Sequence, residues 1–251
     1  QYARCDGYGY GLDGEAWGGE VLFCSQASEG FERLAHLEKQ PLIGGDLATR
    51  YPLRVAAGIL HGEVDVETWL QENQERFPHG EREVHVILNQ LERHDSAVKT
   101  TSCGRILDAI AAVLGICYER TYEGEPAMKL ESLALKGKDV LGLEPEFKKN
   151  VLHTKGLVRA VFENRDEISK ANLAHSVHAY LAKGLATLAI EKASEKGVSS
   201  VGFTGGVACN EIMTQTLRSI IEASGLDFLV HEAVPPGDGG VSFGQAVVAS
   251  F

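Results

Sequence analysis

The chain has 251 residues, 44% of them hydrophobic and 24% charged, which is ordinary for a globular protein with a sizeable core. Its formal charge of −11 argues against a broad nucleic-acid-binding face, and no apolar run approaches the roughly 20 residues of a membrane helix. The five cysteines form no CxxC pair, so neither a zinc ribbon nor a disulfide framework is indicated, and we expect a reducing cytoplasm.

The first predicted elements are two strands joined by a long, glycine-rich turn. Residues 1–5 and 21–24 have strand-like composition, and residues 6–14 between them are rich in Gly and Asp. Successive backbone N–H groups in such a hairpin can form a nest for an anion, so this region is a candidate phosphate site. Asp6, at the end of the first strand, is a candidate ligand for a hard metal ion or, alternatively, a residue that stabilises the turn.

Helices are predicted to dominate the next part of the chain. Residues 31–38 alternate as a short strand, and Asp46 is the expected cap of a helix over 47–60, which its internal proline starts or bends. The segments 65–77 and 81–94 have the composition of exposed, charge-rich helices, and we assign them no chemistry.

A better-defined helix is predicted after residue 100. Thr101 and Ser102 cap an amphipathic pattern that ends at Gly115. Arg105 and Asp108 lie three residues apart at its polar edge, a spacing that allows an ion pair.

Three further elements follow. A Gly-Glu-Pro turn at 124–126 opens a short helix, residues 157–162 form a predicted strand, and the longest helix is expected over 165–196. That helix carries His175 and His178, a spacing at which two histidines can share a metal ion. Because no third ligand is visible nearby, we interpret both histidines as structural.

The most informative stretch follows the longest helix. The apolar run Val198–Phe203 predicts a buried strand that breaks at Gly205 and Gly206, after which a helical pattern begins. Paired glycines let a ligand approach backbone N–H groups, and the helix start adds a positive dipole end. Asn210 stands where its amide could bond a base or a ribose edge. The alternative is a tight strand-to-helix turn without a ligand.

The same design recurs near the end of the chain. A predicted strand at 228–230 leads into the Pro-Pro-Gly-Asp-Gly-Gly turn at 235–240, and a helix over 241–249 follows. Three glycine turns at strand ends, together with long helices, predict a nucleotide held between the layers of an α/β fold.

Six motifs together resemble the C-terminal, Kae1-like part of the HypF hydrogenase-maturation carbamoyltransferases. They are DGYGYGLDGEAWGGE (6–20), PLIGGDLATRYPLR (41–54), TSCGRILDAIAAVLG (101–115), TYEGEPAMKLE (121–131), FTGGVACNE (203–211) and PPGDGGVSFGQA (235–246). They follow the order of that family and span nearly the whole chain. The fifth motif alone would also suit the tRNA-modifying Kae1/TsaD proteins, whereas the first, second and fourth are closer to HypF.

The resemblance implies an α/β fold of the ASKHA type (actin, sugar kinase, Hsp70; RNase H-like), with nucleotide bound between two lobes. Residues 1–251 are then a fragment of a Kae1-like domain. Residues 5–30 and 101–233 would belong mainly to the second lobe, residues 40–100 to a mostly helical insertion, and residues 238–251 to a C-terminal helix directed toward the first lobe.

The resemblance also implies an activity. In such proteins a YrdC-like domain makes carbamoyl-adenylate from carbamoyl phosphate and ATP, and the Kae1-like domain passes the carbamoyl group to the C-terminal cysteine of HypE. The product becomes the cyanide ligand of the NiFe-hydrogenase centre. We therefore expect ATP or carbamoyl-adenylate as ligand, HypE as partner, and upstream YrdC-like and acylphosphatase-like domains. Neither a membrane nor nucleic acid is an expected partner.

Candidate site residues follow from the matched motifs. Gly205, Gly206 and Asn210 match an adenosine-binding motif, and Gly18 and Gly19 match a phosphate loop. A carbamoyl-adenylate already carries AMP as its leaving group, so the site need only orient it, stabilise the charge that develops, and admit a thiolate.

A metal site is expected as well. Asp238 matches the metal-binding aspartate of the family and Asp6 a second one, which makes both candidates for catalysis and for binding zinc, iron or magnesium. The family also uses an HxxxH segment before the first motif, and this chain begins after the position where that segment would lie.

The ribose contact is the least determined. Gly124, Glu125 and Glu131 are nucleotide-binding candidates, and because Lys129 stands where Kae1 relatives carry a ribose-binding acid, Glu131 or Glu125 would serve instead. Two alternatives to HypF-type transfer stay open: threonylcarbamoyl transfer to tRNA adenosine, and a nucleotide-binding module that docks a partner without chemistry of its own.

Overall fold

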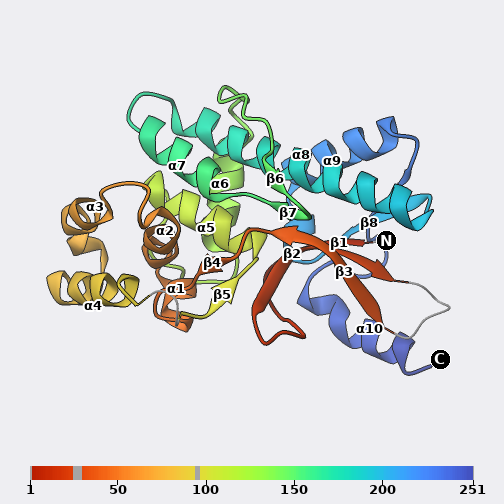
Figure 1. Cartoon of the computed structure of the whole chain (residues 1–251), viewed down its shortest axis with the longest axis horizontal. Helices are drawn as coiled ribbons and strands as arrows, with labels where there is room; N and C mark the ends of the chain where they lie inside the picture. The colour runs from red at the N-terminus through yellow and green to blue at the C-terminus, as the bar shows by residue number, and fades with distance from the viewer. Residues whose placement is uncertain (1, 25–29, 94–96, 251) are drawn as a thin grey trace.

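A mixed β-sheet runs through the centre of the computed structural model, which describes residues 2–24, 30–93 and 97–250, with the backbone alone for residues 2–8 (Figure 1). Its main path over the described residues has the order β6-β7-β3-β2-β1-β8-β9, while β5 pairs with β2 and β4 pairs with β5. The strands are β1 (Tyr2–Tyr10), β2 (Ala16–Cys24), β3 (Phe31–Leu37), β4 (Gln40–Pro41), β5 (Lys99–Thr100), β6 (Phe147–Lys148), β7 (Val151–Leu152), β8 (Ser200–Thr204) and β9 (Asp227–Leu229).

Helices cover this sheet and extend beyond it. The α-helices are α1 (Asp46–Arg50), α2 (Leu53–Leu60), α3 (Val66–Glu72), α4 (Glu81–Leu91), α5 (Cys103–Val113), α6 (Glu125–Ala134), α7 (Lys155–Asn164), α8 (Lys170–Lys196), α9 (Glu211–Ala223) and α10 (Val241–Val248). The described ranges also contain the short 3₁₀ helices η1 (Gln74–Arg76), η3 (Gly206–Cys209) and η4 (Asp238–Gly240). The helices α1 to α4 gather at one end of the molecule, opposite α9 (Figure 1).

The hairpin of β1 and β2 is longer than predicted. The two strands pair antiparallel as far as Tyr10 and Ala16, with an irregularity between Cys5 and Gly9, so most of the expected turn is strand. Gly18 and Gly19 consequently lie inside β2 and are buried. They were expected in a loop, and the structure has them in extended strand conformation instead.

Packing explains the glycine at position 19. A Cβ atom there would collide with the carbonyl oxygen of Thr101 and with the side chain of Leu37. Gly19 therefore lets β2 approach the segment that leads into α5, because any larger residue would push the two backbones apart.

Helix α5 is the centre of the core. Its N-cap is Ser102, whose hydroxyl accepts a hydrogen bond from the backbone N–H of Arg105, as the sequence predicted. All of its residues are buried, because it contacts α2, α6 and α7 on the helical side and β1 and β2 on the sheet side. The expected polar edge is therefore covered, and Arg105 and Asp108 form their ion pair inside the protein.

Two predicted elements need correction. Asp46 is the first residue of α1, and Gly45 precedes it as the N-cap without any side-chain hydrogen bond. Residues 157–162 belong to helix α7, not to a strand. The apolar side chains of that segment fall at spacings that place them on one buried helical face: Leu157, Val158, Val161 and Phe162.

The long helix ends where the sequence predicts but begins at Lys170, five residues later than the predicted start at 165. Helix α8 ends at Gly197, which adopts the left-handed conformation. The ring of His178 is fully buried, and its Nδ1 lies 2.7 Å from the carbonyl oxygen of Ala174. The Nδ1 of His175 lies 3.1 Å from the carbonyl oxygen of Ala134. Each ring thus has a backbone partner, and no group of three or more His, Cys, Asp or Glu side chains suited to a metal occurs among the described residues.

The last helix packs on little of the described chain. Helix α10 has no buried residue, and Val241, Phe243 and Val248 are more than half exposed. No helix in the described ranges is both long and apolar enough to cross a membrane.

Candidate functional site

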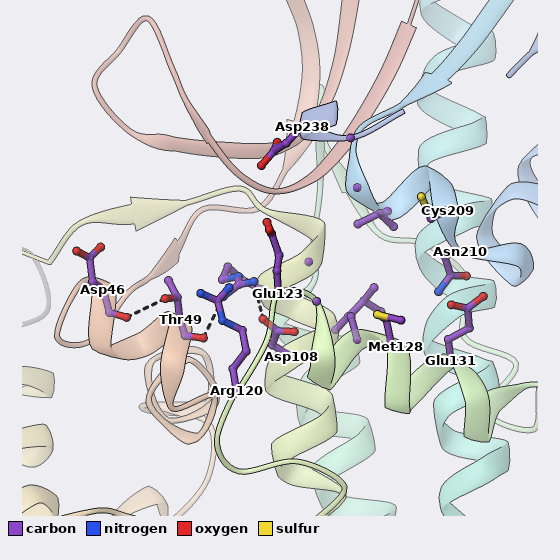
Figure 2. Close-up of a pocket in the computed structure, with 18 residues that line it drawn as sticks. Asp46, Thr49, Asp108, Arg120, Glu123, Met128, Glu131, Cys209, Asn210 and Asp238 are labelled. Atoms are coloured by element: carbon purple, nitrogen blue, oxygen red, sulfur yellow. Dashed lines mark hydrogen bonds and ion pairs between the residues drawn. The ribbon is translucent and has the colours of Figure 1, made fainter. Parts of the chain in front are cut away.

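A cavity of about 690 Å³ opens between α1, α5, α6, η3 and η4. A volume of several hundred Å³ is typical of sites that hold a nucleotide-sized ligand. Figure 2 shows its lining. Five residues expected from the sequence lie on this lining: Gly124, Glu131, Gly206, Asn210 and Asp238.

The other expected residues lie elsewhere. Gly18 and Gly19 are in β2, while Gly205 and Glu125 stand directly beside residues that line the cavity without lining it themselves. Asp6 is in β1, and its side chain lies outside the described residues.

The two glycine turns are joined to each other at the cavity wall. The backbone N–H of Gly205 donates a hydrogen bond of 2.8 Å to the carbonyl oxygen of Pro236, and the hydroxyl of Thr204 lies 3.3 Å from the same oxygen. Gly205 has φ of 99°, which a residue with a Cβ rarely adopts. Its N–H is thus used to hold Gly206 and Asp238 on one wall, and is not available to a ligand.

At one end of the cavity, Asn210 is the N-cap of α9. Its Oδ1 accepts a hydrogen bond of 2.9 Å from the backbone N–H of Met213, so the amide nitrogen is the group left for a ligand. Glu131 lies opposite and accepts a bond of 2.6 Å from the N–H of Glu211 (Figure 2). Burial, with the nearby charge of Glu211, raises the pKa of Glu131.

At the other end, α5 contributes a buried ion pair. The Arg105 Nη2 atom lies 2.7 Å from Asp108 Oδ2, and the two side chains are 5% and 1% exposed. Burial raises the pKa of Asp108, while the positive charges of Arg105 and Arg120 oppose that rise. Asp108 Oδ1 and Arg105 Nε are buried and have no hydrogen-bond partner within the described part of the chain.

The residues at the Arg105–Asp108 end of the cavity were not predicted from the sequence. Arg105 and Asp108 were expected as a surface pair and Arg120 had no expected role, although all three line the cavity. The available signal was two charged residues inside a helix whose other positions are nearly all apolar, since charged residues are rarely placed in such a helix without a function.

Glu125 has a structural position. It accepts hydrogen bonds from the backbone N–H and the hydroxyl of Thr121 at 2.6 and 2.8 Å, and pairs with Lys129 at 2.6 Å. The hydrogen bond from Lys129, together with the smaller effect of the two bonds from Thr121, lowers the pKa of Glu125 to about 2. Glu125 thereby holds the turn in which Gly124, with φ of 74°, precedes α6. Between the two ribose candidates, the geometry favours Glu131.

Three acidic side chains line the cavity besides Asp108 and Glu131. Asp46, Glu123 and Asp238 line it from three different segments, and Figure 2 shows the last two near one another. Asp238 is the one described member of the expected metal pair, and a single carboxylate does not constitute a metal site. We therefore derive no reaction step through a metal.

Comparison with known proteins shows the family of this chain. Over residues 3–245 the chain matches the family described as carbamoyltransferase, Kae1-like domain, second subdomain. The chain belongs to the HypF carbamoyltransferase family.

HypF relatives match over almost the full chain. The probable carbamoyltransferase HypF of Methanocaldococcus jannaschii is 42% identical over 243 residues, covering 96% of this chain and 31% of that protein. The carbamoyltransferase HypF homolog of Cupriavidus necator is 34% identical over 256 residues, covering 98% of this chain and 64% of that protein. This chain thus spans between about a third and two thirds of the length of these relatives.

Solved HypF structures have the same fold. The crystal structure of T. kodakarensis HypF superposes with a TM-score of 0.89 at 43% identity, covering 99% of this chain and 33% of that one. Full-length HypF in its phosphate- and nucleotide-bound form gives a TM-score of 0.87 at 31% identity. The match covers 99% of this chain and 39% of that one. The expected α/β, Kae1-like fold is therefore confirmed.

The HypF-type cavity of this chain has two chemically different ends. Asn210 and Glu131 provide a polar pair suited to the base and ribose hydroxyls of a nucleoside, next to the apolar surface of Met128. At the other end Arg105 is paired with Asp108, and Arg120 offers a guanidinium for an anionic group on a lining that also carries Asp46, Glu123 and Asp238.

Proposed function

We propose that this chain is the carbamoyl-transferring part of a HypF-type protein. It binds carbamoyl-adenylate, or ATP, in the cavity of Figure 2 and transfers the carbamoyl group to the C-terminal cysteine of HypE, for the cyanide ligand of NiFe-hydrogenase. The observation that carries this proposal is the joining of the two glycine turns through Gly205 and Pro236, because it brings Gly206 and Asp238 to one cavity that also holds Asn210.

The two ends of the cavity suggest the orientation of the ligand. The amide nitrogen of Asn210 would donate to an acceptor on the base or ribose, and Glu131 would accept from a ribose hydroxyl. The phosphate and carbamoyl groups would then extend toward Arg105 and Arg120. This orientation pairs the anionic part of the ligand with the positive charge at that end of the cavity.

The chemistry needed beside Arg120 is modest. The acceptor thiolate attacks the carbamoyl carbon, an S–C bond forms, and the C–O bond to the phosphate breaks, so AMP leaves with the electron pair. The thiol proton goes to solvent before the attack. Arg120 is the less buried of the two arginines, and its guanidinium would stabilise negative charge on the carbamoyl oxygen and on the departing phosphate.

The remaining parts of the reaction belong to other domains. The relatives are longer than this chain, which fits the proposal that a first lobe, a YrdC-like domain and an acylphosphatase-like domain lie in the same protein. The exposed apolar side chains of α10 are suited to packing against such a lobe.

The decisive experiment is a transfer assay on the longer protein that carries this chain. Carbamoyl phosphate with a labelled carbon, ATP and HypE are supplied, and label on HypE is counted for wild type and for Arg120→Gln. We expect transfer to fall about a hundredfold in Arg120→Gln. The control is Arg218→Gln, a partly exposed arginine on α9 that does not line the cavity.

Each alternative predicts a different result. A docking module without chemistry binds ATP but labels no HypE in the wild-type protein. A tRNA-modifying enzyme shifts tRNA in a gel and, given threonine and bicarbonate, adds threonylcarbamoyl to adenosine. Equal transfer by wild type and Arg120→Gln would remove Arg120 from the site while leaving carbamoyl transfer itself intact.

A further inference from the structure

Arg105 connects two elements that line the cavity. Its Nη2 atom pairs with Asp108 on α5 at 2.7 Å, and its Nη1 atom lies 3.5 Å from the carbonyl oxygen of Thr49 in α1. The side chain of Arg105 is 5% exposed, so the guanidinium group is largely shielded from solvent. Figure 2 shows Thr49, Asp108 and Arg120 on one stretch of the lining, and Arg105 joins α1 to α5 there.

Helix α1 depends on such contacts for its position. It has five residues, Asp46–Arg50, which is too short for a helix to be stable by itself. The last carbonyl groups of a helix have no partner within it. Here Arg105 approaches the carbonyl of Thr49, and the backbone N–H of Arg120 donates a hydrogen bond of 2.8 Å to the carbonyl of Arg50. The end of α1 is thus held by α5 on one side and by the segment that carries Arg120 on the other.

A second ion pair joins α1 to that segment. The guanidinium of Arg50 lies 2.9 Å from Glu119, the residue before Arg120, and the two side chains are 60% and 46% exposed. Exposed ion pairs contribute little to stability, because water screens them. The buried contacts of Arg105 are therefore the ones that can hold α1 against α5.

We propose that Arg105 is a positioning residue for carbamoyl transfer, which holds α1 against α5 and thereby fixes where Arg120 places its guanidinium. Arg105 itself does not touch the ligand, because Asp108 and the carbonyl of Thr49 take up its two terminal nitrogens. This inference rests on the proposed function, in which Arg120 stabilises negative charge during transfer. Misplacing a catalytic group by about 1 Å can cost on the order of a hundredfold in rate, so a loosened α1 should slow transfer measurably.

The first test is Arg105→Lys in the transfer assay described above, on the longer protein at saturating ATP. Lysine keeps a positive charge opposite Asp108 but lacks the planar fork that reaches two partners in fixed directions. We expect the transfer rate per folded protein to fall about tenfold. A second variant combines Arg105→Gln with Asp108→Asn, which leaves no unpaired buried charge and should show the same loss. Circular dichroism gives the folded fraction of each variant.

Arg54 provides a matched control. It is also a buried arginine, 2.8 Å from Glu83 and 3.3 Å from the carbonyl oxygen of Ile43, and it does not line the cavity. Arg54→Lys should therefore reduce stability as Arg105→Lys does, and leave the transfer rate per folded protein unchanged.

A double-mutant cycle with Arg120→Gln separates positioning from general loosening. If Arg105 acts through Arg120, then Arg105→Lys should lower transfer by less than about twofold once Arg120 has been replaced. Two losses that multiply would mean that Arg105 acts independently of Arg120, and would overturn the inference.

The two proposals fail in different ways. If the wild-type protein labels no HypE, the proposed function fails and this inference fails with it. If wild type transfers the label and Arg105→Lys transfers it equally fast, this inference alone is overturned. The same holds if Arg54→Lys slows transfer as much as Arg105→Lys does, or if Arg120→Gln leaves transfer unchanged.

Discussion

Asn210 has two polar ends, and within the described residues a hydrogen bond is seen at its Oδ1. Its Oδ1 caps α9 by accepting a hydrogen bond from the N–H of Met213. Its amide nitrogen is the donor that it can offer to a ligand in the cavity, which Asn210 lines. The same residue therefore starts a helix and presents a donor to the site. These two roles can be separated by substitution, because Asp caps a helix as well as Asn does but has no N–H.

We expect Asn210→Asp to keep the stability of the chain within about 0.5 kcal/mol and to weaken ATP binding about tenfold. The lost donor and the added negative charge both act against the nucleotide. Asn210→Ala is the matched variant, since it should lose about 1 kcal/mol of stability as well as affinity. Urea unfolding and calorimetry measure the two quantities. Unchanged affinity in both variants would exclude the amide from the site.

His178 connects a single buried residue to the pH dependence of stability. Burial, with a smaller contribution from the charge of His175, lowers its pKa from the ordinary 6.5 to about 4. Between these values the unfolded chain binds a proton that the folded chain does not, so stability falls as the pH drops from 6.5 toward 4.

Between pH 7 and pH 5 this one group should reduce the free energy of unfolding by about 2 kcal/mol. The corresponding change should be absent from His178→Gln, which cannot titrate in this range. Urea unfolding of both proteins at the two pH values gives the comparison. The same loss in both would mean that other groups cause the acid sensitivity.

At the scale of elements, β2 shows how a glycine can be required for packing in a segment that resembles a binding loop. Gly19 lies in the strand, paired opposite Cys5, and faces the carbonyl oxygen of Thr101 at the approach to α5. The neighbouring Glu20 is fully buried and binds Thr101 and Arg33, which ties β2 to the same segment and to β3. This junction fixes α5, and with it the arginine end of the cavity.

Gly19→Ala should therefore reduce stability by about 1–3 kcal/mol, since neither backbone can move away without disturbing Glu20. Gly156→Ala is the control, because Gly156 lies in α7 with open space around the added methyl group. That variant should be more stable than wild type by about 0.4–1 kcal/mol. Thermal unfolding distinguishes the two. If Gly19→Ala is as stable as wild type, the close contact does not constrain β2.

At the scale of the whole molecule, the distribution of buried surface is uneven. Among the described side chains, those from β2 to β9 form one continuous core, whereas α10 contributes no buried side chain to it. Its exposed valines and Phe243 suit a surface contact with another part of a longer protein. The folded core of this chain should therefore not depend on α10.

Removing residues 241–251 should change the thermal midpoint of the 251-residue chain by less than about 2 °C. The physical reason is that no apolar area of the core becomes exposed. In the longer protein the same deletion should reduce carbamoyl transfer, if α10 contacts the proposed first lobe. A drop of many degrees in the isolated chain would show that α10 packs on it.

The sequence by itself determined the elements whose signals are local. The capping of α5 by Ser102 and the end of α8 at Gly197 depend on one or two residues and their own backbone geometry. The same holds for the glycine turn at 205–206, and the order of the six motifs indicated the HypF family. Residues 157–162 were mistaken for a strand because a short apolar run carries no length or partner information.

Only the tertiary structure decided which side chains share the cavity. Arg105 and Asp108 look like a surface pair in the sequence. In the structure they form a buried ion pair that lines one end of the cavity, because α2, α6 and β1 cover the rest of α5. Gly19 was assigned to a phosphate loop, yet its neighbour across the fold is Thr101, far away in the chain. Burial and contact across such distances depend on how all elements pack together, and no local pattern encodes that arrangement.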